Sequence, residues 1–364
     1  MSDFMKVAAE LAGRAAGNTF PNPIVGAVLV QGGQILGEGF HRRAGAPHAE
    51  VEALRGVDAC GATLFVTLEP CDHTGRQAPC TEAVIASGVR HVVVGTMDPN
   101  PVTNGRGVAR LREAGIRVDV LNDPACVALI EDFAVWSAQE RPFVALKMAT
   151  SLDGFVASSS GMRYRLSGQP WIDALRSLRY RYHAVMVGAG TALIDDPQLF
   201  AAPSVREVPF RRIVVAGTRP IPTTLRIFSK NDRYQKTVVL VPDADIPWVQ
   251  ELRTVADVLQ VAGADGSVDL ARAFGALHEL GVCSVLCEGG PTIGARLIAA
   301  GLVDRLYWAI APVFLRTDEA VPVLGGADLA SLRQRLAIDS VERVGDDVVI
   351  SGTLARTPPG GLNV

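Results

Sequence analysis

The 364-residue sequence has no apolar run long enough to cross a membrane. Its longest uninterrupted apolar stretches, such as residues 24–30 and 307–315, are far shorter than the roughly 18 residues that a membrane span needs. Residues 1–11 also lack the apolar block of a signal peptide, because Asp3, Lys6 and Glu10 interrupt them. We therefore expect a cytoplasmic protein with no membrane partner.

The sequence also lacks an excess of charge and a large set of cysteines. Its 35 basic and 38 acidic residues give a net charge of −3, and no basic run is present that would attract a phosphate backbone. This disfavours a nucleic-acid partner. The six cysteines are too few and too scattered for a disulfide scaffold, so in a reducing compartment each is a thiol or a metal ligand.

The length predicts two domains, at roughly 150 residues per domain. Apolar positions at helical spacing alternate with β-rich runs in both halves, which is typical of the α/β class. The last helix expected in the first half, residues 126–138, leads to Arg141-Pro142. We place the boundary there, with one domain at residues 1–142 and the other at residues 143–364.

Three candidate metal ligands occur in the first half of the chain. His48 stands at the start of an expected helix, Cys71 follows a predicted strand, and Cys80 opens a further helix. One imidazole and two thiolates are the protein ligands of a catalytic zinc whose fourth position is kept for water. Glu50 lies near the helix start that carries His48, where it can transfer protons without ligating the metal.

These residue types indicate hydrolytic deamination. Zinc lowers the pKa of a bound water to about 7, so hydroxide is available to attack an amidine-like ring carbon at neutral pH. His-x-Glu with a later Pro-Cys pair is the pattern of zinc base deaminases, although Cys80 lies nine positions after Cys71 rather than three. A structural zinc would need a fourth ligand, and His73 follows Cys71 too closely to serve. The alternative is that the two cysteines are unrelated buried thiols and that His48 only begins a helix. The occurrence of all these residues together in one pattern disfavours it.

At these motifs the chain resembles the bifunctional riboflavin-biosynthesis deaminase/reductase family, over nearly its whole length. The long insert between the two cysteines is typical of that family and differs from cytidine and tRNA-adenosine deaminases. The matching segments are Pro21–Gly26, His48–Glu50, Thr67–Cys71, Pro79–Cys80 and Asp98–Pro101 in the first half, and Leu146–Gly154, Thr191, Asp195–Pro197 and Cys287–Thr292 in the second.

The resemblance implies a cytidine-deaminase-like three-layer domain followed by a dihydrofolate-reductase-like domain, both α/β. It implies zinc-dependent hydrolysis of the ring amine of 2,5-diamino-6-ribosylamino-4(3H)-pyrimidinone 5′-phosphate, and then NADPH reduction of the ribosyl to the ribityl chain. The partner is accordingly a small pyrimidine ribosyl phosphate. The family also suggests a homo-oligomer.

The resemblance assigns roles in the first domain residue by residue. His48, Cys71 and Cys80 would bind zinc, and Glu50 would be the catalytic proton donor. Contacts to the pyrimidine and its phosphate are expected from Asn22, His41, His73 and Arg76. Turn capping or a solvated surface would account for these last four equally well.

In the second domain, the segment Cys287–Thr292 can be interpreted without the family. A strand ends in two glycines and a helix follows, so backbone N–H groups at the helix start can hold a pyrophosphate, although Gly-Gly also serves as a plain turn. No Gly-x-Gly-x-x-Gly follows a strand, so a Rossmann site is not expected. By the family's pattern, NADPH contacts are expected from Ala149, Thr191, Asp195, Gly290, Pro291, Thr292, Ile293, Gly294, Ala295 and Arg296. Contacts to the reductase substrate are expected from Arg163, Arg179, Leu199 and Glu288.

The second domain departs from the family pattern where its ligands should lie. Arg163 and Arg165 replace a serine and a tryptophan, Ala202 replaces an arginine expected to bind the substrate phosphate, and Ala216-Gly217 replaces an Asp-Ser pair. We hypothesise that the two new arginines supply the missing positive charge. One alternative is a deaminase whose C-terminal domain binds or dimerises without hydride transfer. Another is a deaminase for a related pyrimidine or an editor of nucleic acid, and the acidic balance argues against the editor.

Overall fold

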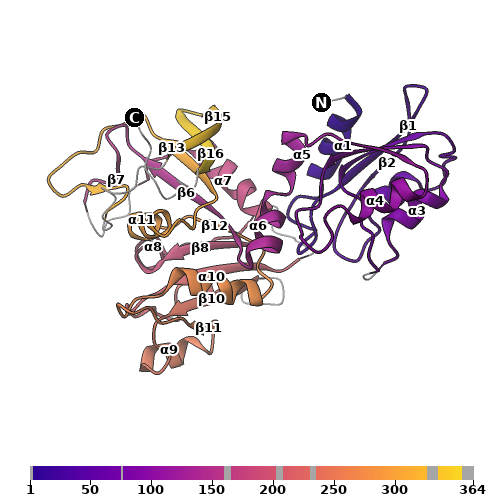
Figure 1. The fold of residues 1–364 in the computed structure, drawn as a ribbon. Helices are drawn as coiled ribbons and strands as arrows, with labels where there is room; N and C mark the ends of the chain where they lie inside the picture. The colour runs from indigo at the N-terminus through magenta and orange to yellow at the C-terminus, as the bar shows by residue number, and fades with distance from the viewer. Residues whose placement is uncertain are drawn as a thin grey trace, which may run out of the picture. The chain divides into compact units, whose positions relative to one another are not determined.

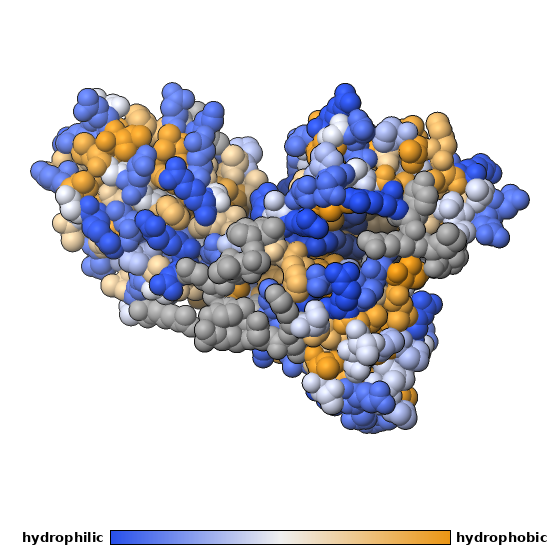
Figure 2. Space-filling view, turned by 180° about the vertical axis from the view of Figure 1, so that it is seen from behind, coloured by the Kyte–Doolittle hydropathy of each residue, from blue (hydrophilic) through white to orange (hydrophobic). Residues whose placement is uncertain are grey.

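The computed structural model describes residues 3–74, 77–159, 165–201, 208–229, 235–325 and 335–354. The chain divides into two compact units, Met1–Arg141 and Pro142–Val364, and each is built around its own sheet (Figure 1). Hydrophilic and hydrophobic residues are interspersed on the face drawn in Figure 2. No helix in the described part of the chain combines the length with the hydropathy that crossing a lipid bilayer takes.

The first unit holds a five-stranded mixed sheet in the order β2-β1-β3-β4-β5. Strand β1 runs antiparallel to β2 and β3, whereas β3, β4 and β5 are parallel. The strands are β1 (Gly26–Gln31), β2 (Gln34–Phe40), β3 (Thr63–Leu68), β4 (His91–Thr96) and β5 (Arg117–Val120). The helices are α1 (Asp3–Gly13), α2 (Ala49–Ala53), α3 (Cys80–Ala86), α4 (Arg106–Glu113), α5 (Pro124–Leu129) and α6 (Glu131–Gln139).

Helices cover both faces of this sheet. Apolar residues of α2, α3 and α4, among them Ala53, Val84 and Leu111, pack on one face. Helices α1 and α5 cover the other face, through residues such as Met5 and Cys126. The first unit is therefore the three-layer α/β domain that the sequence predicts.

One expected helix is divided in two. Its spacing predicts a single helix over residues 126–138, but α5 ends at Leu129 and α6 begins at Glu131. Ile130 between them has φ −119° and ψ 17°, away from the helical region, and its side chain is buried, with 3% of its surface exposed. The break allows the side chain of Ile130 to be buried in the core, and the helical hydrogen bonding is interrupted there.

The second unit holds a nine-stranded sheet in the order β11-β10-β9-β8-β12-β6-β13-β16-β15. Its strands are parallel except for the C-terminal hairpin of β15 and β16, which joins β13 antiparallel. The strands are β6 (Phe143–Thr150), β8 (Ala184–Gly188), β9 (Phe210–Val215), β10 (Gln235–Val241), β11 (Asp257–Gln260), β12 (Ser284–Cys287), β13 (Arg305–Ile310), β15 (Leu336–Val344) and β16 (Asp347–Leu354); β7 (Phe155–Ala157) and β14 (Val321–Pro322) form a separate pair.

Helices also cover both faces of the larger sheet. They are α7 (Gln169–Arg181), α8 (Ala189–Asp195), the 3-10 helix η1 (Arg226–Phe228), α9 (Pro247–Leu252), α10 (Leu270–Glu279) and α11 (Pro291–Ala299). Phe274 of α10 and Leu297 of α11 pack on one face, and Ala192 of α8, Val249 of α9 and Trp171 of α7 lie in the clusters on the other. Because both faces are covered, the central strands are almost entirely apolar, as in other buried parallel sheets.

Gly26 shows how closely α1 lies against β1. A Cβ atom at this position would lie 2.0 Å from the carbonyl oxygen of Ala8 and 2.8 Å from the backbone nitrogen of Ala12. We predict that Gly26→Ala destabilises the first unit by about 1–3 kcal/mol, because backbone atoms cannot move aside as a flexible side chain can. The measurement is hydrogen–deuterium exchange of the α1 and β1 peptides, which should become faster.

The matched control for this prediction is Gly13→Ala at the end of α1. Nothing lies within 4 Å of a Cβ atom there. Exchange in α1 and β1 should therefore stay close to that of the unmodified protein. Equal exchange rates in the two variants would contradict the assignment of Gly26 as a site of backbone contact.

Candidate active sites

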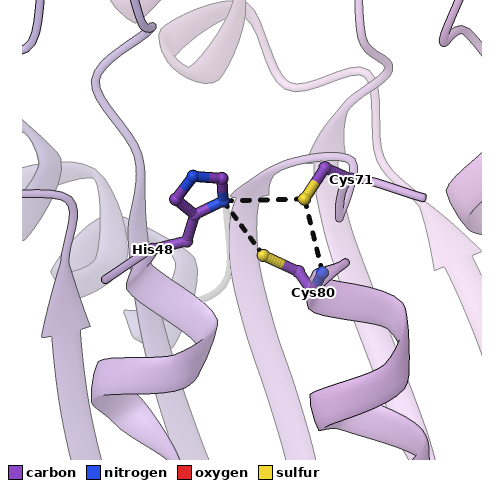
Figure 3. A group of neighbouring side chains, drawn as sticks. All are labelled: His48, Cys71 and Cys80. Carbon is purple, nitrogen blue, oxygen red and sulfur yellow. Dashed lines mark hydrogen bonds between the residues drawn. The ribbon is translucent and has the colours of Figure 1, made fainter. Parts of the chain in front are cut away.

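Three side chains from separate elements converge at one side of the first sheet. His48 directly precedes α2, Cys80 is the first residue of α3, and Cys71 lies in the loop after β3. The Nδ1 atom of His48 lies 3.1 Å from Sγ of Cys80 and 3.6 Å from Sγ of Cys71 (Figure 3). All three ligand atoms lie within 4.8 Å of one another. The structure thus brings together the three residues predicted as metal ligands.

The geometry of this cluster fits a tetrahedral zinc ion. With Zn–N distances of about 2.0–2.1 Å and Zn–S distances of about 2.3 Å, the imidazole nitrogen and each sulfur would be separated by about 3.6 Å. The observed distances of 3.1 Å and 3.6 Å are close to that value. One nitrogen and two sulfur donors are also a donor set that zinc prefers. The fourth tetrahedral position has no ligand among the described protein side chains of the cluster.

The surroundings of the cluster favour an ionised thiol. The backbone N–H of Cys80 donates to Sγ of Cys71 over 3.3 Å. Hydrogen bonding from Cys80, assisted by His48, lowers the pKa of the Cys71 thiol to about 4 against the opposing effect of burial. A thiolate is the form of cysteine that binds metals.

Glu50 lies in the first turn of α2 and is 3% exposed. Its burial raises the pKa of the carboxyl to about 7, with a smaller contribution from Cys71. A carboxyl with a pKa near the working pH can both accept and release a proton. Its position and its acidity therefore suit the proton transfer that the sequence predicts.

Two of the four predicted substrate contacts lie beside this cluster. The ring of His41 packs edge-on against the ring of His48, with centroids 5.1 Å apart. Nδ1 of His41 lies 3.1 Å from the carbonyl oxygen of Pro47, which can only accept, so Nδ1 donates and Nε2 accepts from the Asn22 amide over 3.1 Å. Burial lowers the pKa of His41, in agreement with a neutral ring. His73 is exposed in the loop between the two cysteines, and Arg76 lies outside the described residues.

The second unit places a buried ion pair at the carboxyl end of β12. Glu288 follows this strand directly, and Arg179 reaches it from α7. The Nη2 atom of Arg179 lies 2.8 Å from Oε2 of Glu288, Nε donates to the other carboxylate oxygen, and Nη1 donates to the carbonyl oxygen of Phe200 over 3.1 Å. The two side chains are 14% and 7% exposed. The carboxyl ends of parallel strands are where ligands bind in α/β sheets.

Lys147 is a third charged group at this position, and the motifs of the sequence assigned it no role. It lies on β6 one residue after Leu146, which pairs with Cys287 of β12. Burial lowers its pKa, and the charge of Glu288 acts in the opposite direction. A lysine inside an otherwise apolar strand, Phe143–Thr150, is the sequence signal that could have identified it.

The predicted cofactor residues meet where two helices begin. A Cβ atom on Gly290, which precedes α11, would lie 3.3 Å from Oγ1 of Thr191 in α8. Pro291 is half-buried and Thr292 is exposed at the start of α11. The next three expected contacts, Ile293, Gly294 and Ala295, are buried beneath the start of the helix. The guanidinium of Arg296 donates to the carbonyl oxygen of Val268 and to the hydroxyl of Ser267.

The remaining predicted reductase residues are spread over several elements. Ala149 is half-buried on β6, Asp195 ends α8, and Leu199 is buried with φ +54°. Arg165 is exposed, and its guanidinium donates to Gln169. Gly217 has φ +61° after β9, a conformation that glycine adopts without strain. Arg163 and Ala202 lie outside the described residues.

Comparison with known families identifies both units. Residues 1–96 match the cytidine and deoxycytidylate deaminase zinc-binding region, and residues 142–350 match the RibD C-terminal domain. The chain belongs to the RibD family. This confirms an enzyme of riboflavin biosynthesis with a zinc-binding deaminase domain and an NADPH-using reductase domain of dihydrofolate-reductase-like fold.

Full-length members of the RibD family match almost the entire chain. The riboflavin biosynthesis protein RibD of Aquifex aeolicus is 38% identical, with 96% of this chain and 97% of that protein covered. RibD of Escherichia coli is 34% identical over 95% and 97% of the two chains. Among solved structures, Acinetobacter baumannii RibD has a TM-score of 0.84 at 31% identity, covering 97% and 98%. The deaminase/reductase of Thermotoga maritima has a TM-score of 0.83 at 32% identity with the same coverage.

The ion pair of Arg179 and Glu288 generates a stability prediction. Arg179→Ala would leave the carboxylate buried without its cation, and breaking a buried pair in this way costs about 3–5 kcal/mol. We expect the urea midpoint of the second unit to fall accordingly. Arg176→Ala on the same helix removes an exposed pair with Asp173 and should change stability by less than about 0.5 kcal/mol. Similar midpoints for the two variants would contradict the prediction.

Proposed function

We propose that this chain catalyses two successive steps on one pyrimidine nucleotide. The first is hydrolysis of the ring amine of 2,5-diamino-6-ribosylamino-4(3H)-pyrimidinone 5′-phosphate, and the second is NADPH reduction of its ribosyl to a ribityl chain. The observation that carries the proposal is the cluster of His48, Cys71 and Cys80 with the buried Glu50 beside it, in a chain that also has a RibD C-terminal domain.

In the deaminase reaction, His48, Cys71 and Cys80 would hold the zinc ion. Zinc, when bound, lowers the pKa of a water ligand to about 7. Glu50 takes a proton from the attacking water and delivers it to the leaving amine. Its burial keeps this exchange away from solvent and matches its acidity to neutral pH.

The pyrimidine would lie against Asn22 and His41 on one side of the cluster, with its hydrogen bonds made by Asn22, because both ring nitrogens of His41 are already engaged. Because His41 Nε2 accepts one N–H of the Asn22 amide, the oxygen and the second N–H of that amide are left for the ring. His41 thereby fixes the orientation of Asn22. We assign His73 and Arg76, in the loop between the cysteines, to the outer part of the substrate and its phosphate.

In the reductase reaction, we assign NADPH to the starts of α8 and α11. Gly290 and Thr292 would offer backbone N–H groups and Thr191 a hydroxyl, while Pro291, which has no N–H, would border the same site with Ala149 and Asp195. The buried residues Ile293, Gly294 and Ala295 hold this turn from beneath, and Arg296 ties it to the segment Ser267–Val268.

The reductase substrate would lie against Arg179, Glu288, Leu199 and Arg163. Glu288 is held by two of the three nitrogen donors of Arg179, Nε and Nη2, so its carboxylate has a fixed orientation at the end of the sheet. We add Lys147 to this set, because it lies on β6 beside the end of β12 and the charge of Glu288 acts on its ammonium group. We further propose that the protein is a homo-oligomer, and a cytoplasmic location stays a prediction.

Glu50→Gln tests the deaminase assignment. The variant should keep its zinc and lose deamination by about 10²–10⁴-fold, because only the proton-transferring group is removed. Cys71→Ser should lose metal and activity together. The measurement is mass-resolved turnover of the diaminopyrimidinone ribosyl phosphate with and without NADPH, since deamination exchanges an imino group for oxygen and reduction adds two hydrogens. Glu52→Gln, at a neighbouring position of α2, is the control, and near-normal turnover by Glu50→Gln would refute the role.

The two new arginines generate a prediction for the reductase. If Arg163 and Arg165 bind the phosphate in place of the arginine that Ala202 replaces, converting both to alanine should raise the KM of the reductase step by about one to two decades, with a smaller effect on kcat. The same mass-resolved assay, started from the deaminated compound, measures this. An unchanged KM would show that the phosphate is bound elsewhere, and absence of any reduction in the unmodified protein would favour the deaminase-only alternative.

A further inference from the structure

Glu69 is a buried carboxylate that no step described above uses. It is 5% exposed and stands two residues before Cys71. Its Oε2 accepts the backbone N–H of Asp98 over 3.2 Å and that of Gly105 over 3.0 Å, and its Oε1 accepts that of Val108 over 3.0 Å. One side chain thus binds both ends of the loop 98–105 and the first turn of α4.

The helix α4 depends on this carboxylate for its N-terminal cap. Gly105, the residue before the helix, has φ 80° and offers no side chain to accept the first N–H groups. A negative charge at this end also interacts favourably with the helix dipole. Glu69 therefore supplies from a distant segment the cap that the local sequence of α4 lacks.

The segment between Glu69 and Cys71 is a single rigid residue. Pro70 has a fixed φ and no N–H group. Its carbonyl oxygen lies directly against α4, because a Cβ atom on Gly107 would be only 1.9 Å from it. A shift of α4, once the Glu69 carboxylate no longer holds it, would therefore act through the Pro70 carbonyl on the backbone of Cys71.

Helix α3 also holds Cys71. The backbone N–H of Thr81 donates to the carbonyl oxygen of Cys71 over 3.2 Å, and the N–H of Cys80 donates to its sulfur over 3.3 Å. Cys71 is thus fixed between the starts of two helices. On the α3 side the Thr81 hydroxyl also donates to Oδ1 of Asp72 over 2.7 Å, whereas on the α4 side the Glu69 carboxylate accepts all three backbone N–H groups.

We propose that Glu69 is a positioning residue of the metal site, which holds the Cys71 sulfur in place by binding α4 and its preceding loop. The inference rests on the proposed role of Cys71 as a zinc ligand. Groups that orient metal ligands typically change metal affinity by about 10–100-fold when they are removed. Glu69 therefore acts on zinc binding through Cys71 and without contact to the metal or the substrate.

The test is zinc release from the full-length, zinc-loaded protein to a coloured chelator. Glu69→Gln keeps the size of the side chain but turns one acceptor oxygen into an N–H donor that faces backbone N–H groups. We expect zinc release to become about 10–100-fold faster. Asp123→Asn is the matched control, because Asp123 is also a buried carboxylate that caps a helix, α5, through Ala125. Its zinc release should stay within about twofold of the unmodified rate.

The outcomes separate this inference from the proposed function. If Cys71→Ser loses zinc while Glu69→Gln releases it at the unmodified rate, the positioning role is overturned and the metal assignment stands. If Cys71→Ser retains zinc as well as the unmodified protein, the metal assignment itself is refuted, and this inference with it.

A second variant keeps the test decisive if Glu69→Gln does not fold. Gly107→Ala keeps the carboxylate in the chain and presses a methyl group against the carbonyl oxygen of Pro70, 1.9 Å away, and more weakly against Cγ of Glu69, 3.3 Å away. Alanine is otherwise the better helix residue, so a faster loss of zinc would arise from displacement of the Pro70–Cys71 backbone. Release at the unmodified rate in Gly107→Ala would overturn the inference.

Discussion

The deaminase site depends on direct backbone contact between α2 and the edge strand β2. A Cβ atom on Gly39 would lie 2.2 Å from the carbonyl oxygen of Ala49, and one on Gly37 would lie 2.1 Å from that of Ala53. Helix α2 has only five residues, and a helix of that length is unstable in isolation. Packing against β2 therefore fixes the helix, and the position of its first turn decides where the reacting groups lie.

Two helix starts meet at this position, and their partial positive charge suits the groups found there. Helix α2 begins directly after His48, and α3 begins at Cys80. The N–H of Cys80 at the start of α3 donates to the sulfur of Cys71 and favours its thiolate form, whereas the hydrogen bond to Cys71 and burial raise the pKa of the Cys80 thiol. Glu50 is buried more deeply, where loss of hydration favours the protonated carboxyl. One short region thus holds an ionised thiol beside a carboxyl that can store a proton.

The metal cluster and the α/β class could be predicted because their signals are local. The residue types alone predict a zinc site, because His48 is followed two residues later by Glu50 and each of the two cysteines follows a proline. Roles that arise from contact between distant segments have no such signal. Glu69 was part of a matching motif, but its three donors lie in the loop 98–105 and in α4, and the break at Ile130 follows from burial in the core. For Lys147, the sequence shows a charged residue in an apolar strand, but only the folded structure shows that it lies near Glu288.

The charged groups at the end of β12 are better explained by function than by stability. A buried ion pair loses the hydration of both partners, and apolar residues of similar volume often stabilise a protein equally well or better. Arg179 and Glu288 are nevertheless buried together, and Lys147 adds a second cation beside the same carboxylate. The carboxylates of Asp195 and Asp347 also act on Lys147, so charged groups of both signs gather at the edge where parallel strands end and ligands bind. Charged groups that orient one another by hydrogen bonds, as Arg179 orients Glu288, suit the specific recognition of a polar substrate better than they suit the packing of a core.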